Sequence, residues 1–316
     1  MRPLYKYLED LATPGNTIGM GNPVAADGET IGSEPLPTAK ACRERPCKKR
    51  RRKANESLLD IDDSSINSQA EEYATAEIKE WIDKVYDEMD CVIDLKTHTV
   101  NYNWDLEVKD TSIDRLMPEG WSWGVVNGFF NCSWCPNLTS LKGAPKEMVG
   151  DFFCGNCGSL ISLEGAPREV RGGFNCYNCR NLKTLKGAPE KVGWDFDCGN
   201  CDSLISLEGA PREVGGSFDC AYCKNLKTLE GAPKIVNGNF RCSWCISLKS
   251  LKGSPKKVGG DFDCRDCKLL GSLERSSKIV GRDFICTGCN KLSSLDGAPE
   301  KIGGEIVADT GLKKLL

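Results

Sequence analysis

Apolar and polar positions along residues 129–306 recur with a period of 22 residues. A phenylalanine opens each unit and a cysteine follows two residues later, in eight copies without a change of spacing. The phenylalanines are Phe130, Phe152, Phe174, Phe196, Phe218, Phe240, Phe262 and Phe284. Each unit continues with a second cysteine, two leucines, a turn that mostly reads Gly-Ala-Pro, and an apolar residue such as Val170. Self-similarity at such a period is typical of a solenoid.

The Phe-x-Cys stretch alternates with a period of two residues, which predicts a short strand with one buried face. Gly-Ala-Pro ends regular structure and turns the chain. A unit of 22 residues cannot enclose a core by itself, so its neighbours must cover its apolar side. Parallel stacking places successive rungs about 4.8 Å apart, with Phe on Phe, Leu on Leu and Cys on Cys. The sequence therefore predicts a β-rich repeat solenoid of short parallel strands.

The unit F-x-C-x-x-C-x-x-L-x-x-L-x-G-A-P resembles a leucine-rich repeat. In this comparison, valine, phenylalanine and the first cysteine occupy the positions of the strand leucines in a leucine-rich repeat. The second cysteine occupies the position of its asparagine or cysteine ladder. One extra residue before the next leucine departs from that pattern. The array is also similar to uncharacterised repeat proteins of tailed bacteriophages and gut bacteria. This resemblance covers residues 129–306 and implies a leucine-rich-repeat-like, non-catalytic binding scaffold, with a phage as one of its two candidate sources.

The sequence before the repeats divides into two parts. Residues 1–67 lack hydrophobic periodicity and are rich in Gly, Pro, Ser and charge, which predicts a disordered leader. Its basic run from Lys48 to Lys53 is either a solvated linker or a contact for nucleic acid. In residues 68–128, Ser68 and Glu71 fit a capping box. Apolar residues at helical spacing follow, so we expect an amphipathic helix over residues 69–90 that caps the first rung.

Degenerate repeats are expected at both ends of the array. Counting back 22 residues places Val108, Asp110, Ile113 and Leu116 at the Phe, Cys, Cys and Leu positions of a first, degenerate repeat. Residues 307–316 continue the pattern without thiols and form a degenerate C-terminal cap. Atypical terminal units of this kind protect the open ends of a solenoid.

Eight C-x-x-C pairs contain all but three of the 19 cysteines. These cysteines could be apolar core residues, zinc ligands or disulfide partners. Thiols can act as small apolar fillers, and their equivalent setting in every rung favours such a cysteine ladder. Two successive pairs, such as Cys132, Cys135, Cys154 and Cys157, also match the spacing of a four-cysteine zinc site. Disulfides between rungs are compatible with the Cα spacing, but a reducing compartment disfavours them.

Composition limits the cellular locations and the kinds of activity that we expect for this protein. The 316 residues carry a formal net charge of −3, and no apolar run approaches the ~20 residues of a membrane helix. The N-terminus lacks a secretory signal pattern, so we expect a cytoplasmic protein, in host cytoplasm or in the virion if a phage encodes it. The single histidine, His98, lies apart from any nucleophile motif, and no phosphate loop or acid pair stands out. We therefore expect neither enzymatic activity nor a cofactor.

Residues that flank the phenylalanine and the first cysteine should point away from the core. We expect a partner-binding face of aromatic and acidic side chains there, with partial burial of the aromatic rings as the alternative. Its members are Trp134, Phe153, Tyr222, Trp244, Asp195, Asp197, Asp219 and Asp263. The favoured function is protein–protein interaction by a monomer that makes no membrane contact. The alternative is a zinc-binding protein that contacts nucleic acid through residues 48–53.

Overall fold

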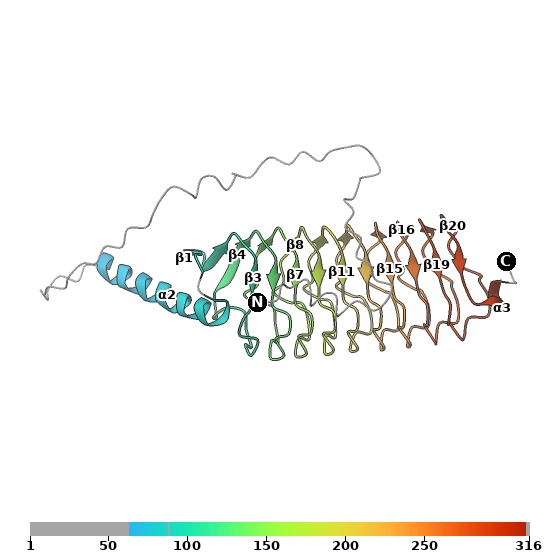
Figure 1. Ribbon diagram of the computed structural model, residues 1–316, viewed down its shortest axis with the longest axis horizontal. Coiled ribbons are helices and arrows are strands. Elements are labelled where there is room, and N and C mark those ends of the chain that lie inside the picture. The colour runs from blue at the N-terminus through green and yellow to red at the C-terminus, as the bar shows by residue number, and fades with distance from the viewer. Residues whose placement is uncertain (1–62, 88, 314–316) are drawn as a thin grey trace, which may run out of the picture. The chain divides into compact units, whose positions relative to one another are not determined.

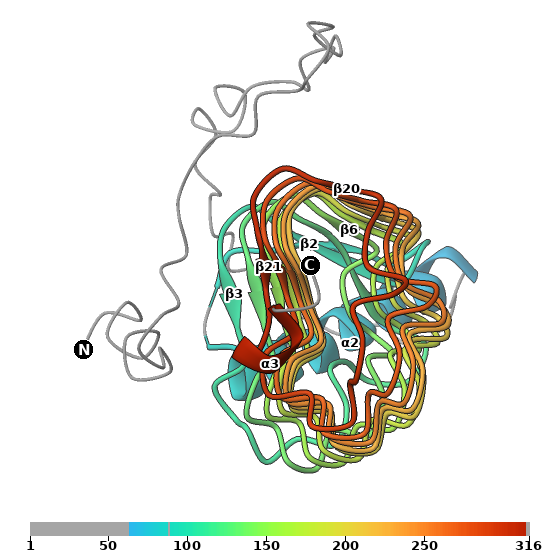
Figure 2. The same cartoon turned by 90° about the vertical axis from the view of Figure 1, so that its right-hand side faces the viewer.

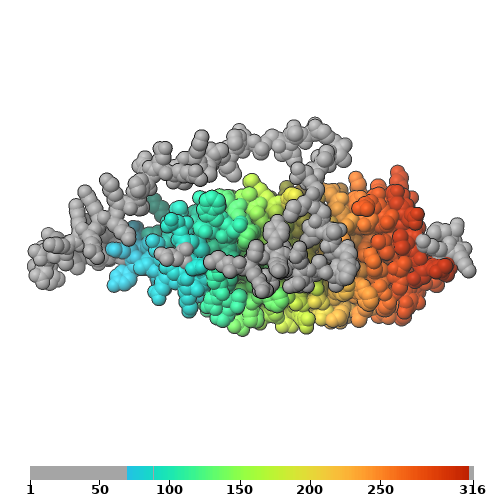
Figure 3. Space-filling view, in the orientation of Figure 1, coloured from blue at the N-terminus to red at the C-terminus, as the bar shows by residue number. Residues whose placement is uncertain are grey.

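Residues 63–87 and 89–313 are described by the computed structural model. Over the repeats the chain winds as a parallel β-solenoid, and each 22-residue unit makes one turn (Figure 1). Successive repeats form successive bands along the surface of the solenoid (Figure 3). The predicted β-rich repeat solenoid is thus confirmed. The leader, apart from residues 63–67, and its basic run from Lys48 to Lys53 lie outside the described residues.

Each turn contributes two short strands, whereas the sequence pattern predicted one. The second strand contains the apolar residue that follows the Gly-Ala-Pro turn, and we call the sheet it forms the valine sheet. Its strands, in spatial order, are β1 (Val92–Asp94), β2 (Thr99–Tyr102), β4 (Ser122–Val126), β6 (Glu147–Met148), β8 (Glu169–Val170), β10 (Lys191–Val192), β12 (Glu213–Val214), β14 (Ile235–Val236), β16 (Lys257–Val258), β18 (Ile279–Val280) and β20 (Lys301–Ile302). Neighbouring strands are parallel except for β1 and β2.

The predicted Phe-x-Cys strands form the other sheet, which we call the phenylalanine sheet. Its strands are β3 (Leu106–Glu107), β5 (Phe130–Asn131), β7 (Phe152–Phe153), β9 (Phe174–Asn175), β11 (Phe196–Asp197), β13 (Phe218–Asp219), β15 (Phe240–Arg241), β17 (Phe262–Asp263), β19 (Phe284–Ile285) and β21 (Ile306–Val307). The register pairs each phenylalanine with the next, as in Phe196 and Phe218. Seen along the solenoid axis, the turns superimpose on one another (Figure 2).

The core is a set of ladders that run the length of the solenoid. The centroids of successive phenylalanine rings lie 5.0–5.5 Å apart. In every repeat the phenylalanine, both cysteines and both leucines are buried. Stacking of identical side chains lets each 22-residue unit share one continuous apolar interior with its neighbours. The predicted burial of these positions is therefore confirmed.

An N-terminal helix, α2 (Asp63–Val85), covers the first rung. Ile78, Ile82 and Tyr86 are buried in the same core as the repeats. The Tyr86 hydroxyl donates a hydrogen bond of 2.6 Å to the carbonyl of Leu116, and its ring meets Trp123 edge-on with 5.0 Å between centroids. The helix begins at Asp63 rather than residue 69, so Ser68 lies inside it and the predicted capping box is wrong. It also ends at Val85 rather than at residue 90.

The first, degenerate rung differs from the prediction by two residues. Leu106, and not Val108, pairs with Phe130 and takes the phenylalanine position. The Val108 N–H donates to the carbonyl of Asn131, which places Val108 where later repeats have their first cysteine. The connection from this strand to Ile113 is two residues longer than in the repeats, so a count of 22 misplaces the strand. At the other end, α3 (Thr310–Lys313) follows β21 and buries Leu312.

Candidate functional site

In five repeats an asparagine or aspartate follows the phenylalanine, and its side chain caps the next turn of its own rung. Oδ1 of Asp197 accepts the N–H of Gly199 at 2.8 Å, and Asp219 accepts that of Ala221 at 2.8 Å. Asn175 makes the same bond to Tyr177 at 2.9 Å. Asp and Asn side chains commonly stabilise turns in this way. The carboxylates of Asp197 and Asp219, which were expected on the partner-binding face, are half-buried and already accept hydrogen bonds from the backbone.

Asp263, Asp195 and Phe153 also have structural contacts. Asp263 is buried, with 6 % of its surface exposed, and pairs with Arg265 at 2.7 Å, so its predicted exposure is wrong. Asp195 is exposed, and its Oδ1 accepts the N–H of Ser217 in the next rung at 2.6 Å. Phe153 is half-buried against Phe129, with 6.2 Å between ring centroids. The acidic part of the expected face therefore serves mainly to order the turns.

Burial changes the protonation of the central carboxylates. Desolvation, followed by the charge of neighbouring Asp219, raises the pKa of Asp197 to about 8. Burial also raises the pKa of Asp219, against the opposing effects of the Ala221 N–H and of Arg241. The two aspartates are direct neighbours in adjacent parallel strands. Burial and a like charge both disfavour the ionised form of a carboxyl, and together they outweigh the bond from the Gly199 N–H, which lowers the pKa of Asp197.

The residue before the second cysteine has a positive φ in all eight repeats, and we call these residues the left-handed row. They are Trp134 (φ 63°), Asn156 (61°), Asn178 (60°), Asn200 (54°), Tyr222 (62°), Trp244 (59°), Asp266 (58°) and Gly288 (70°). Glycine accepts this conformation freely, and Asn and Asp tolerate it, whereas bulky residues are strained by it. Three aromatic residues therefore occupy backbone positions that disfavour them.

The left-handed row forms an exposed ladder of side chains. The amide of Asn178 donates to Asn156 at 2.6 Å, and that of Asn200 donates to Asn178 at 2.8 Å. Beyond them the rings of Tyr222 and Trp244 stack at 6.1 Å with 5° between their planes. The exposed fractions are 61 % for Trp134, 44 % for Tyr222 and 41 % for Trp244. The row thus presents aromatic surface to solvent on both sides of an asparagine ladder.

Lys268 extends the aromatic stack by one rung. Its Nζ lies 5.6 Å from the centroid of the Trp244 ring, within the range of a cation–π contact. The same ammonium group forms an ion pair with Asp266. Tyr222, Trp244 and Lys268 are therefore held in place by one another before any partner arrives.

The second cysteine of each later repeat hydrogen-bonds to the rung before it. Its thiol donates to the carbonyl of the preceding first cysteine, with Sγ–O distances of 3.2–3.4 Å. Within the zinc candidates, the thiol of Cys157 bonds in this way to Cys132. Cys132, Cys135, Cys154 and Cys157 are all buried free thiols. In residues 63–87 and 89–313, no group of three or more His, Cys, Asp or Glu side chains has an arrangement that could hold a metal ion.

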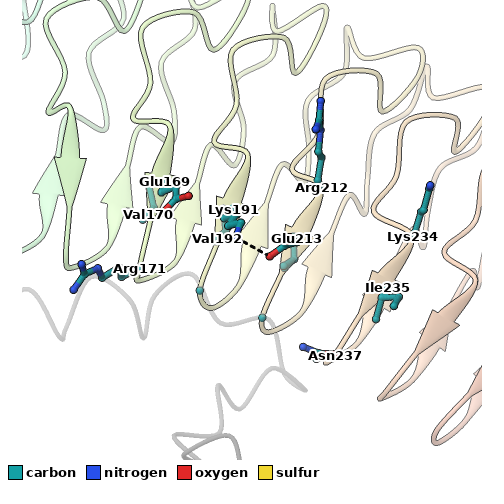
Figure 4. A pocket seen from close by; sticks show the side chains of 13 residues that line it. Glu169, Val170, Arg171, Lys191, Val192, Arg212, Glu213, Lys234, Ile235 and Asn237 are labelled. Atoms are coloured by element: carbon teal, nitrogen blue, oxygen red, sulfur yellow. Dashed lines mark ion pairs between the residues drawn. The ribbon is translucent and has the colours of Figure 1, made fainter. Parts of the chain in front are cut away.

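A shallow hollow of about 580 Å³ lies on the valine sheet, over β8, β10, β12 and β14 (Figure 4). Lys191 and Glu213 cross it as an ion pair at 3.4 Å. Lys234 and Ile235 line its C-terminal side. The hollow is open and contains no cluster of convergent polar groups, so its outline does not indicate a small-molecule site.

No protein-family model, curated protein sequence or solved structure matches the chain. Among the described helices, none is both long and apolar enough to cross a membrane.

Proposed function

We propose that this chain is a non-catalytic, leucine-rich-repeat-like scaffold that binds a protein partner along the left-handed row. Trp134, Tyr222 and Trp244 are the contact residues. The observation that carries the proposal is the positive φ at these exposed aromatic residues. Origin in a phage and a cytoplasmic location stay predictions from the sequence.

The aromatic residues cost stability at their positions without contributing to the core. A left-handed backbone costs a non-glycine residue roughly 1–2 kcal/mol, and Asn fills the equivalent position in three other repeats. Strained residues that persist in a fold cluster at binding and catalytic sites. Exposed aromatic rings add a solvation cost unless a partner covers them. Binding of a partner would explain why aromatic residues are present at these positions, since the fold itself does not require them.

The stack of Tyr222 and Trp244 suits an interface anchor. Aromatic side chains are enriched among residues that dominate binding energy. Because the rings already pack against each other and Lys268, fewer rotamers are lost on binding, which favours affinity. The exposed carboxylate of Asp195, one rung before Tyr222, would mainly favour encounter with a basic partner.

Replacing the anchors with the residue used by other repeats tests the proposal. In Tyr222→Asn/Trp244→Asn the left-handed backbone is better tolerated, so we expect unchanged or higher thermal stability. Partners captured from a cell lysate by the wild type, and identified by mass spectrometry, should bind the variant about tenfold or more weakly. The control is Asn156→Gly/Asn178→Gly, which alters the same row, keeps its conformation and should retain the captured partner.

Two outcomes would contradict the proposal. One is capture of the same partners by Tyr222→Asn/Trp244→Asn with unchanged affinity. The other is loss of binding only when the basic run from Lys48 to Lys53 is removed, which would favour the nucleic-acid alternative. A titration of the purified partner, rather than the capture itself, measures the affinity in each case.

A further inference from the structure

A second exposed ladder lies on the outer face of the valine sheet, and we call it the lysine strip. It consists of Lys234, Lys256, Lys257, Lys278 and Lys301, all exposed. The Lys256 N–H donates to the carbonyl of Lys234 (2.7 Å), and the Lys278 N–H donates to that of Lys256 (3.0 Å). These three lysines therefore occupy equivalent places on successive rungs. The strip also contains two exposed isoleucines, Ile235 (52 %) and Ile279 (38 %), which alternate with Lys257 and Lys301.

The same positions in the N-terminal half of the array serve as an internal reference. There, each rung has one cation and one glutamate, placed on the first residue of β6, β8, β10 or β12 and on the residue before it. Arg168 pairs with Glu190 at 3.3 Å, and Lys191 pairs with Glu213 at 3.4 Å. In the C-terminal half five lysines face a single acid, Glu300, which pairs with Lys278 at 3.4 Å. The outer face of the valine sheet thus has balanced charge in its N-terminal half and an excess of lysine in its C-terminal half.

This imbalance is unfavourable for the isolated protein. Rungs of a parallel sheet lie about 4.8 Å apart, and like charges on directly neighbouring strands are destabilising. Exposed isoleucines on the same face leave apolar surface in water. An occupant that carries acidic and apolar groups would relieve both costs at once.

The surface beside the lysine strip is open to such an occupant. Gly259 and Gly281 follow the buried valines of β16 and β18, and Gly303 follows the partly buried Ile302 of β20, so no side chain projects at these three places. A Cβ added at Gly281 would lie 2.0 Å from the carbonyl oxygen of Gly259, so a side chain at this place would require the backbone to shift. The glycines leave a smooth lane along the lysines and isoleucines.

We propose that the lysine strip is a second binding surface, which takes an acidic polypeptide segment with interspersed apolar side chains. Charge complementarity selects the acidic groups, and the alternating isoleucines select the apolar ones. A nucleic acid fits the strip less well, because no aromatic side chain within it can stack on a base and no arginine within it can grip a phosphate with two hydrogen bonds. This surface is separate from the left-handed row, and it goes beyond the function proposed above.

The test uses a fluorescein-labelled peptide of glutamate and leucine, titrated with the full-length protein and followed by fluorescence anisotropy. We expect binding that weakens as salt is added. Lys234→Gln/Lys256→Gln/Lys278→Gln should lower the affinity about tenfold or more. The matched control, Lys146→Gln/Arg168→Gln/Arg212→Gln, removes three cations from the same row of the other half and should change the affinity by less than about twofold.

Two further measurements identify the class of ligand. Ile235→Ser/Ile279→Ser should weaken binding of the peptide but not of a short DNA duplex. Tyr222→Asn/Trp244→Asn should leave peptide binding unchanged, so failure of this proposal is distinct from failure of the left-handed row. The proposal is overturned if no peptide binding is detected, if both triple variants lose the same affinity, or if the duplex binds more tightly than the peptide through the same lysines.

Discussion

The thiol of Cys223 donates a hydrogen bond to the carbonyl oxygen of Cys198, one rung earlier, with 3.3 Å between Sγ and O. Among the described residues no backbone N–H donates to that carbonyl. A buried carbonyl without a partner costs about 1–3 kcal/mol. The thiol of Cys223 therefore has a polar function in the core, while that of Cys198 mainly fills space.

The two cysteines of this contact should respond differently to truncation. Cys198→Ala removes a buried sulfur but leaves the Cys198 carbonyl paired with Cys223. Cys223→Ala removes a buried sulfur and also the donor, so it should lower the free energy of unfolding by about 1–3 kcal/mol more than Cys198→Ala does. Urea denaturation followed by circular dichroism measures both variants, and an equal loss in the two would contradict the assigned hydrogen bond.

The solenoid could be predicted from the sequence because its ladders repeat without exception, but elements with weaker patterns were missed. A two-residue strand such as β12 buries one side chain, Val214, and exposes the other, which leaves no alternation long enough to recognise. The first rung was misplaced because two extra residues separate Leu106 from Ile113. The start of α2 was misplaced because the Ser68–Glu71 pattern also occurs inside a helix.

The binding surface could be predicted only in part. The aromatic positions were found from their variation, and Tyr222 and Trp244 do lie on neighbouring rungs. Their left-handed backbone was missed, although the sequence held a signal for it: Asn, Asp or Gly fills this position in the other five repeats. The turn-capping bonds of Asp197 and Asp219 depend on backbone geometry, which hydrophobic periodicity does not describe. The sequence pattern does not indicate the lysine strip, because its charge differs between the two halves of one face and not between faces.

Arg275 should be a weak point of the array. It has a φ of 66° at the position where the other seven repeats have a glycine with positive φ. The turn is otherwise kept, since the Ser276 N–H still donates to Leu273. We expect Arg275→Gly to raise the free energy of unfolding by about 1 kcal/mol. Gly187→Ala is the reverse control and should lower it, because a Cβ there would lie 2.5 Å from the Glu164 nitrogen; destabilisation by Arg275→Gly would contradict the strain.

Most repeat thiols should be unreactive in the folded protein, Cys157 and Cys289 being the two whose pKa is lowered, by hydrogen bonds from Cys135 and Cys264. Burial raises the pKa of Cys154, Cys198 and Cys220 well above the ordinary value, and the thiolate is the reactive form. In a variant with Cys42, Cys47 and Cys91 replaced by serine, Ellman's reagent should react slowly until denaturant is added. Native mass spectrometry should find no bound zinc. One zinc ion for every two repeats would instead support a four-cysteine site.

Asp197 should make stability depend on pH in an unusual direction. Its pKa is about 8 in the folded protein, whereas an aspartate in an unfolded chain has a pKa of about 3.9. Between these values the folded state holds a proton that the unfolded state releases. The stabilising contribution of this residue to the free energy of unfolding is therefore complete below about pH 4. It is lost progressively as the pH rises from about 4 to the folded pKa of about 8.

Asp197→Asn should remove this dependence without disturbing the turn. Asn175, one rung earlier, already forms the capping bond with its amide oxygen, so asparagine can replace aspartate in the same contact. We expect the free energy of unfolding of the wild type, measured by urea denaturation from pH 5 to pH 8.5, to fall more steeply than that of the variant. The variant should also be the more stable of the two at the upper end, because it buries no charge beside Asp219. Parallel pH profiles for the two proteins would show that Asp197 is ionised in the folded state at neutral pH, contrary to the effect expected from its burial.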